Sequence, residues 1–153
     1  MKQLVFALQF KGKRTRWPGR YRAKTTASDQ VWRTVLGPGG MEATSEAAGS
    51  GSAMCEIEIE AVVGHGIPDE GEGTFTISGS VKYGTAGTVT FRTVGQGFLG
   101  QAAVPGLQQG AVVWEVTGGD GQLAGATGLI TSNFSMSADG ELIDNQLAQL
   151  FLP

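Results

Sequence analysis

The feature of this sequence that most constrains its fold is a period of two in the placement of apolar and polar residues. The clearest case runs from Cys55 to Val63, where Glu56, Glu58 and Glu60 alternate with apolar residues. Successive side chains of a β-strand point to opposite faces, so this segment predicts a strand with its glutamates toward water. A shift of the pairing register by one residue would bury all three carboxylates at a large free-energy cost. The predicted core-facing residues are Cys55, Ile57, Ile59 and Ala61.

The same period recurs along most of the chain. Leu4, Phe6, Leu8 and Phe10 share one face of a first predicted strand. A predicted loop follows at residues 11–19 and contains the turn signal Trp-Pro-Gly. Further strands are predicted at residues 21–26, 30–36, 41–47, 75–83, 88–96, 111–117, 127–136 and 141–152. The last of these has a composition that also suits a helix, but the Asp139-Gly140 hairpin signal before it favours a strand.

These segments number about eight to ten and are evenly spaced, as in β-sandwiches and β-barrels. Closure into a barrel removes the unpaired sheet edges that expose strands to aggregation. A chain of 153 residues fits one domain and is long enough to bury a core without disulfides or metals. The sequence therefore predicts a single all-β domain over residues 1–153, a closed antiparallel barrel of about eight strands with little helix.

The expected compartment follows from the cysteine usage and from the first residues. A single cysteine excludes an internal disulfide, which suits a reducing compartment. The apolar run at residues 1–10 is interrupted by Gln3 and Gln9 and precedes a basic segment without a cleavage site, so we expect no signal peptide. No apolar stretch reaches the length of a membrane-spanning helix. We expect a cytoplasmic protein with no membrane partner.

The net charge of −3 hides an uneven distribution, because nine of the eleven basic residues lie within the first 33 positions. Such asymmetry is found in nucleic-acid-binding proteins. It is also expected where basic and acidic strands lie side by side in a barrel, with Lys and Arg facing Glu56, Glu58 and Glu60. The acidic remainder would repel phosphates, and no aromatic residues are interleaved with the basic ones. We therefore expect no nucleic-acid partner.

Two apparent motifs do not predict chemistry. Residues 95–100 match the dinucleotide-binding pattern G-x-G-x-x-G, but that motif requires a helix at the glycines, and Pro105 follows too soon. These glycines predict a bulge or a strand end instead. His65 is the only histidine, and together with Cys55 it cannot form a standard transition-metal site. We expect no metal and no cofactor.

Glu115 is the most probable ionisable group of an internal site, because it lies in an apolar strand between Trp114 and Val116. If Trp114 faces outward, Glu115 points into the barrel, where burial would raise its pKa and fit it for acid–base catalysis. If Trp114 faces inward, Glu115 is solvated. Tyr83 is the second candidate acid. The candidate ligand contacts on predicted strands are Arg92, Trp114, Asn133 and Asn145.

A family resemblance lies in the C-terminal half of the chain. Residues 116–128 read Val-Thr-Gly-Gly-Asp-Gly-Gln-Leu-Ala-Gly-Ala-Thr-Gly, which resembles a glycine-rich turn of the allene oxide cyclase and dirigent-like barrel superfamily. The match covers roughly residues 89–134 and includes the Trp-Glu strand before the turn, a feature shared with small bacterial proteins of unknown function. The resemblance implies an eight-stranded antiparallel barrel with an apolar cavity. Only the turn carries over residue by residue, and no catalytic residue of the family maps onto this sequence.

Within that superfamily, some members cyclise unsaturated epoxides or polyketide-derived chains by folding a flexible substrate, and others guide radical coupling. Two function classes follow for this chain. The first is a barrel that binds a small apolar molecule in its interior without chemistry. The second is a cyclase or isomerase that uses an acid such as Glu115 or Tyr83. We also expect a homodimer, because one strand face cannot bury all of the C-terminal apolar residues Leu147, Leu150, Phe151 and Leu152.

Overall fold

The computed structural model describes residues 2–17, 20–27, 30–37, 40–47, 54–60 and 73–153 of the chain. The strands are β1 (Lys2–Trp17), β2 (Arg20–Ala27), β3 (Gln30–Gly37), β4 (Gly40–Ala47), β5 (Met54–Glu60), β6 (Gly73–Tyr83), β7 (Gly87–Thr93), β8 (Gly97–Gln101), β9 (Leu107–Gly119), β10 (Thr127–Ser137) and β11 (Glu141–Leu152). In this part of the chain the only helical segment is the 3-10 turn η1 (Gly121–Leu123), so no helix there spans a membrane.

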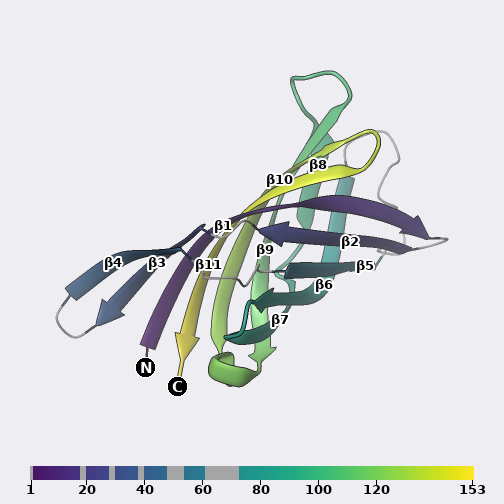
Figure 1. Ribbon diagram of the computed structural model, residues 1–153. Helices are drawn as coiled ribbons and strands as arrows, with labels where there is room; N and C mark the ends of the chain where they lie inside the picture. Colours follow the sequence, from purple (N-terminus) through teal and green to yellow (C-terminus); the bar gives the residue numbers. More distant parts are fainter. Residues whose placement is uncertain (1, 18–19, 28–29, 38–39, 48–53, 61–72) are drawn as a thin grey trace.

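All strand pairings are antiparallel, and they close on themselves. Hydrogen-bonded neighbours follow the order β11-β10-β9-β7-β6-β5-β2-β1, and β1 pairs in turn with β11. Figure 1 shows this closing pair as the purple and yellow strands, with Lys2 opposite Leu152 at one end. This ring confirms the predicted fold, an all-β closed antiparallel barrel of about eight strands.

Strand β1 is long enough to serve two neighbours along one edge. Residues 3–7 pair with β3 and residues 10–17 pair with β2, while the other edge pairs with β11 over residues 2–13. The β3–β4 hairpin therefore projects from the barrel wall beside β1 (Figure 1). The predicted loop at residues 11–19 is wrong, because strand β1 continues to Trp17. Backbone pairing on both edges sustains this half of the strand, which has no apolar alternation to reveal it.

The register between β2 and β5 aligns basic with acidic residues. Lys24 lies opposite Glu56, Arg22 opposite Glu58, and Arg20 opposite Glu60. Opposite charges at facing positions of an antiparallel pair stabilise the sheet. This register supports the interpretation of the basic N-terminal segment as one side of a strand pair.

Strands β7 and β8 occupy one place in the ring, as two successive segments between β6 and β9. The break between them falls at residues 94–96, where Gly95 has a φ of 67°. Thr93 spans the break, because its Oγ1 accepts a hydrogen bond from the Ile77 amide at 2.7 Å and donates one to the Ile77 carbonyl at 2.9 Å. The G-x-G-x-x-G segment is thus a strand break followed by a strand, as predicted, and no helix begins there.

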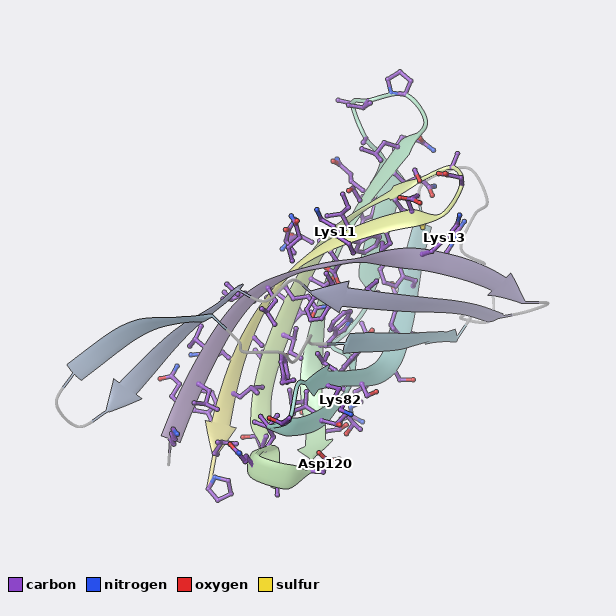
Figure 2. All side chains as sticks on the ribbon, viewed as in Figure 1. Lys11, Lys13, Lys82 and Asp120 are labelled. Atoms are coloured by element: carbon purple, nitrogen blue, oxygen red, sulfur yellow. The ribbon has the colours of Figure 1, made fainter. Side chains whose placement is uncertain are left out.

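The core lies on the inner face of the ring and draws on β1 and β6 to β11. Leu4, Leu8 and Phe10 are buried, as the alternation in the first strand predicts. Phe91 and Trp114 stack inside the barrel, with ring centroids 4.1 Å apart and an interplanar angle of 15°. At one end, the carboxylate of Asp120 accepts a hydrogen bond from the Thr88 amide and so ties the glycine-rich turn to β7; Figure 2 labels Asp120 there.

Two predictions concern parts of the molecule outside the described residues or side chains. Residues 61–72, which include His65, are outside them. Strand β5 is confirmed as a strand over Met54–Glu60, but the orientation of its side chains, including that of Cys55, is outside the described part.

Candidate functional site

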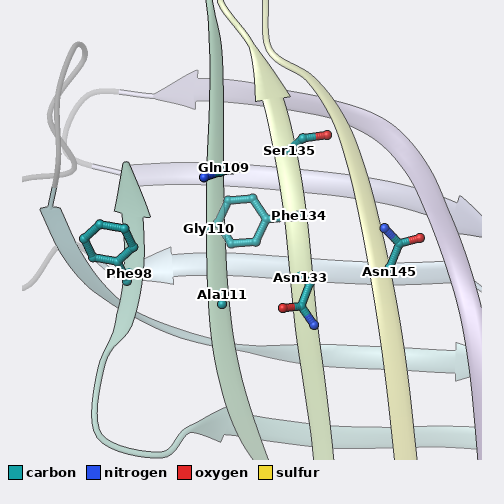
Figure 3. Close-up of a pocket in the computed structure, with 8 residues that line it drawn as sticks. All are labelled: Phe98, Gln109, Gly110, Ala111, Asn133, Phe134, Ser135 and Asn145. Carbon is teal, nitrogen blue, oxygen red and sulfur yellow. The ribbon is translucent and has the colours of Figure 1, made fainter. Parts of the chain in front are cut away.

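A hollow of about 410 Å³ lies on the outer wall of the barrel, over strands β8 to β11. We call it the outer hollow. The side chains around it are those of Phe98, Gln109, Ala111, Asn133, Ser135 and Asn145, shown in Figure 3. All but Ser135, which is half-buried, are exposed, while their neighbours along the strands face the core. The side chains around the hollow are therefore mainly outward-facing ones.

The strand registers bring these residues together from four strands. Phe98 pairs with Ala111, Ala111 with Asn133, and Asn133 with Asn145, so the four positions form one row across the wall. Next to this row, Gln109 pairs with Ser135. The side chain of Ala111 is shorter than the Phe98 ring on one side and the Asn133 amide on the other. This difference in length produces the hollow.

The backbone of Gly110 and the ring of Phe134 complete the hollow. A Cβ at Gly110 would lie 2.5 Å from the carbonyl oxygen of Phe98 and would also collide with the Phe134 ring. Phe134 packs inward against the core and meets Phe75 edge-on, with ring centroids 5.8 Å apart. Glycine at position 110 is therefore needed for the close approach of β8, β9 and the Phe134 ring.

The polar groups of the hollow are largely unused by the protein. Asn145 accepts one hydrogen bond, from the Gln9 amide at 3.0 Å. Within the described residues, the side chains of Gln109, Asn133 and Ser135 have no protein hydrogen-bond partner. None of the lining residues that the structure describes is charged. The hollow thus offers amide and hydroxyl groups beside an aromatic ring, without a formal charge.

A second polar group lies inside the barrel and was not predicted from the sequence. Asp144 on β11 is 1% exposed, and its neighbours Ser132 and Gln146 are also buried. Its carboxylate accepts hydrogen bonds from the Ser132 hydroxyl at 2.6 Å and from the Gln146 amide at 2.7 Å. Burial raises the pKa of Asp144 to about 6, although both hydrogen bonds act to lower it. Asp144 is therefore the described carboxylate best placed to exchange a proton near neutral pH.

The placement of Glu115 inside the barrel is wrong. Trp114 faces inward and is 1% exposed, so Glu115 points out, with 48% of its side chain exposed. Both Nε and Nη2 of Arg92 donate hydrogen bonds to one Glu115 oxygen, at 3.1 and 3.0 Å. The inward row of β9 is the more apolar one, and burial of the Trp114 indole decides the orientation. Arg92 and Glu115 therefore form a surface ion pair outside the hollow.

The remaining predicted residues fall on both sides of the wall. Asn133 and Asn145 face outward and lie together in the outer hollow, not in the interior where the ligand site was expected. Tyr83 is buried in the core cluster and takes part in interactions there. Trp114 is also in the core, where its Nε1 has no hydrogen-bond partner among the described residues. No group of three or more potential metal ligands occurs in the described part of the chain.

Comparisons of the chain with protein-family models, curated proteins and solved structures gave no match. The resemblance to the allene oxide cyclase and dirigent-like barrels is therefore supported only at the level of a closed antiparallel barrel.

Proposed function

We propose that this protein is a small-molecule-binding β-barrel and that the outer hollow is its ligand site. The observation that carries the proposal is a hollow of about 410 Å³ in which an exposed aromatic ring adjoins several polar groups that have no partner among the described residues. Small-molecule sites have volumes of roughly 300 to 1,000 Å³ and combine apolar surface with a few oriented polar groups.

The composition of the hollow favours binding over catalysis. Among the described residues, its lining contains no carboxylate, histidine, lysine or cysteine, so none of them can act as a base that activates the hydroxyl of Ser135. Phe98, in contrast, is 51% exposed, and a ligand that covered this ring would remove apolar surface from water. The hollow has the groups for recognition and lacks those for proton transfer.

A ligand screen by protein-detected NMR tests the proposal. Neutral aromatic and amide fragments should shift the resonances of Ala111, Asn133 and Phe98 more than those of the core. The variant Ala111→Trp fills the hollow from its outward-facing floor and should abolish these shifts. Val113→Trp is the matched control, because Val113 faces outward two residues further along β9 and does not line the hollow. Equal binding by both variants would refute this site.

A second candidate function is a cyclase or isomerase, supported by the buried Asp144 carboxyl with its raised pKa. In this alternative Asp144, instead of Glu115, supplies the acid or base within the barrel. An unsaturated fatty epoxide incubated with the protein should then yield a cyclised or isomerised product, measured by mass spectrometry. Asp144→Asn should abolish product formation, whereas Glu115→Gln should leave it unchanged. Absence of enzyme-dependent product, or equal turnover by Asp144→Asn, would exclude this candidate.

A further inference from the structure

We infer that the ligand of the outer hollow is a neutral carbohydrate, with its apolar ring face on Phe98 and its hydroxyl groups on the asparagines. This inference rests on the proposed function, because it assigns a ligand class to the same site. It is carried by the order of groups along one row of the barrel wall: an aromatic ring, a methyl group and two amides.

The aromatic end of the row provides a stacking surface. Phe98 is half exposed on the outer face of β8, and its neighbour across the strand pair is Ala111. A small residue beside an exposed ring leaves room for a flat ligand to lie along the wall. The C–H face of a sugar ring is apolar and flat enough for this contact, and it would cover the exposed ring.

The amide end of the row suits hydroxyl groups. A carboxamide carries both donors and an acceptor, and a hydroxyl group likewise donates and accepts. Asn133, Gln109 and Ser135 have no protein partner within the described residues, so a ligand with several hydroxyl groups can engage them together. A wholly apolar ligand would instead bury these groups unpaired, which costs the free energy of removing each of them from water. The polar lining therefore disfavours the apolar ligand expected from the sequence.

The charges around the hollow disfavour an anionic ligand such as a nucleotide. No lining residue is a cation, whereas phosphate recognition depends on lysine, arginine or helix N-termini. The nearest cation by register is Lys11, which pairs with Ile143, the neighbour of Ser135. Lys11 lies outside the lining, on the strand next to β11 and two residues from Gln9, which pairs with Asn145; Figure 2 labels it on β1. A neutral ligand fits this surface best.

The spacing of the strands sets the length of the ligand. Neighbouring strands lie about 4.8 Å apart, so the step from β8 to β11 spans roughly 14 Å. A ligand that contacts both Phe98 and Asn145 has to cover most of this span, which exceeds a single sugar ring. We therefore expect disaccharides to bind more tightly than their component monosaccharides.

The test is an NMR titration with cellobiose, maltose, lactose and chitobiose, followed through the side-chain amides of Asn133, Asn145 and Gln109. At least one disaccharide should shift these signals, and its affinity should fall by about 10-fold or more in Phe98→Ala, through loss of the stacking contact. Val104→Ala is the matched control, since Val104 is 60% exposed but does not line the hollow, and it should bind like the parent.

Benzamide, a neutral aromatic amide, separates the two proposals. If benzamide shifts the hollow residues and no disaccharide does, the carbohydrate inference is wrong and the binding site stands. If neither probe shifts them, both the inference and the proposed function are wrong. Disaccharide shifts that persist unchanged in Phe98→Ala, or that lie outside the hollow, also overturn the inference. The folded state of each variant is checked from its amide spectrum before titration.

Discussion

Asp144 makes the stability of this barrel depend on pH in a direction opposite to that of most carboxylates. Its pKa is raised from 3.8 to about 6 by burial inside the barrel. Between pH 4 and pH 6, the Asp144 carboxyl is therefore ionised in the unfolded chain and protonated in the folded protein. The free energy of unfolding therefore decreases as pH rises from about 4 to about 6 and is constant, with respect to this group, above that range.

The size of the effect follows from the difference between the two pKa values. A difference of about 2 pH units, at 1.36 kcal/mol per unit, corresponds to about 3 kcal/mol of destabilisation above pH 6. The variant Asp144→Asn has no charge to bury, so it should gain stability at pH 8. Its new NH₂ group faces the Gln146 amide nitrogen unless that amide turns over, and a lost hydrogen bond costs about 1 kcal/mol. The expected net gain at pH 8 is about 2 kcal/mol.

The assay is urea denaturation of the parent and of Asp144→Asn at several values from pH 4 to pH 8. The difference between the two free energies of unfolding isolates Asp144, because all other titrating groups are shared. It should shift in favour of the variant as pH rises through 4 to 6. Asp139→Asn is an exposed control on the adjoining turn. The Ser137 hydroxyl lowers the pKa of Asp139, so its contribution changes mainly below pH 4, and its difference should stay nearly flat from pH 4 to pH 8. A flat difference for Asp144→Asn would refute the reasoning.

Three further predictions test the fold, the surface and the assembly. Gly128 has a φ of 138°, and a Cβ added there would collide with the carbonyl oxygen of Gln149. Gly128→Ala should therefore lower the free energy of unfolding, measured by thermal denaturation, by about 2 to 4 kcal/mol. Gly106→Ala, at a φ of 77° with open space, should cost only about 1 kcal/mol, and equal losses would contradict the clash. The Arg92–Glu115 ion pair is exposed, so Arg92→Gln and Glu115→Gln should each change the free energy of unfolding by less than about 1 kcal/mol. Both variants should still bind fragments, and a loss of binding would place the ion pair in the ligand site. The expected homodimer can use the outer face of β11, where Leu147 is 48% exposed. Sedimentation should then show a dimer for the parent protein and a monomer for Leu147→Lys. A monomeric parent protein would contradict the expected dimer.

The strands and the closed barrel were predictable because the period of two is local information. Glu141–Leu152 is strand β11, and Asp139-Gly140 forms the turn before it, with a φ of 87° at Gly140. The second half of β1 was missed because the sequence of residues 11–17 shows no apolar alternation. This segment is held by backbone pairing with β2 and, as far as Lys13, with β11.

The interior carboxylate was missed because both faces of β11 mix polar and apolar residues. The inner row contains Leu142, Asp144, Gln146, Ala148 and Leu150, and the outer row contains Ile143, Asn145 and Leu147. Neither row is apolar enough to identify it as the core. Asp144 shares a period of two with Leu142 and Leu150, but Ile143 and Leu147 show the same period on the other face, so the sequence does not decide between them.

The outer hollow was predictable only in part. Asn133 and Asn145 were named as candidate ligand contacts of an interior site, but they face outward, and their proximity depends on the register between β10 and β11. The contribution of Phe98 depends on its pairing with Ala111, which joins β8 to β9. Such pairings between strands are set by tertiary packing, and no local pattern reports them.

The most direct test of the central claim, that the ligand site lies on the outer wall and not inside the barrel, is a measurement of intermolecular nuclear Overhauser effects in a ligand-saturated sample. Phe98 and Ala111 face outward, whereas Trp114 and Phe10 are buried in the core. We predict contacts from ligand protons to the Phe98 ring and the Ala111 methyl group. Contacts to the Trp114 or Phe10 ring, without any to Phe98, would contradict the account and place the ligand in the interior.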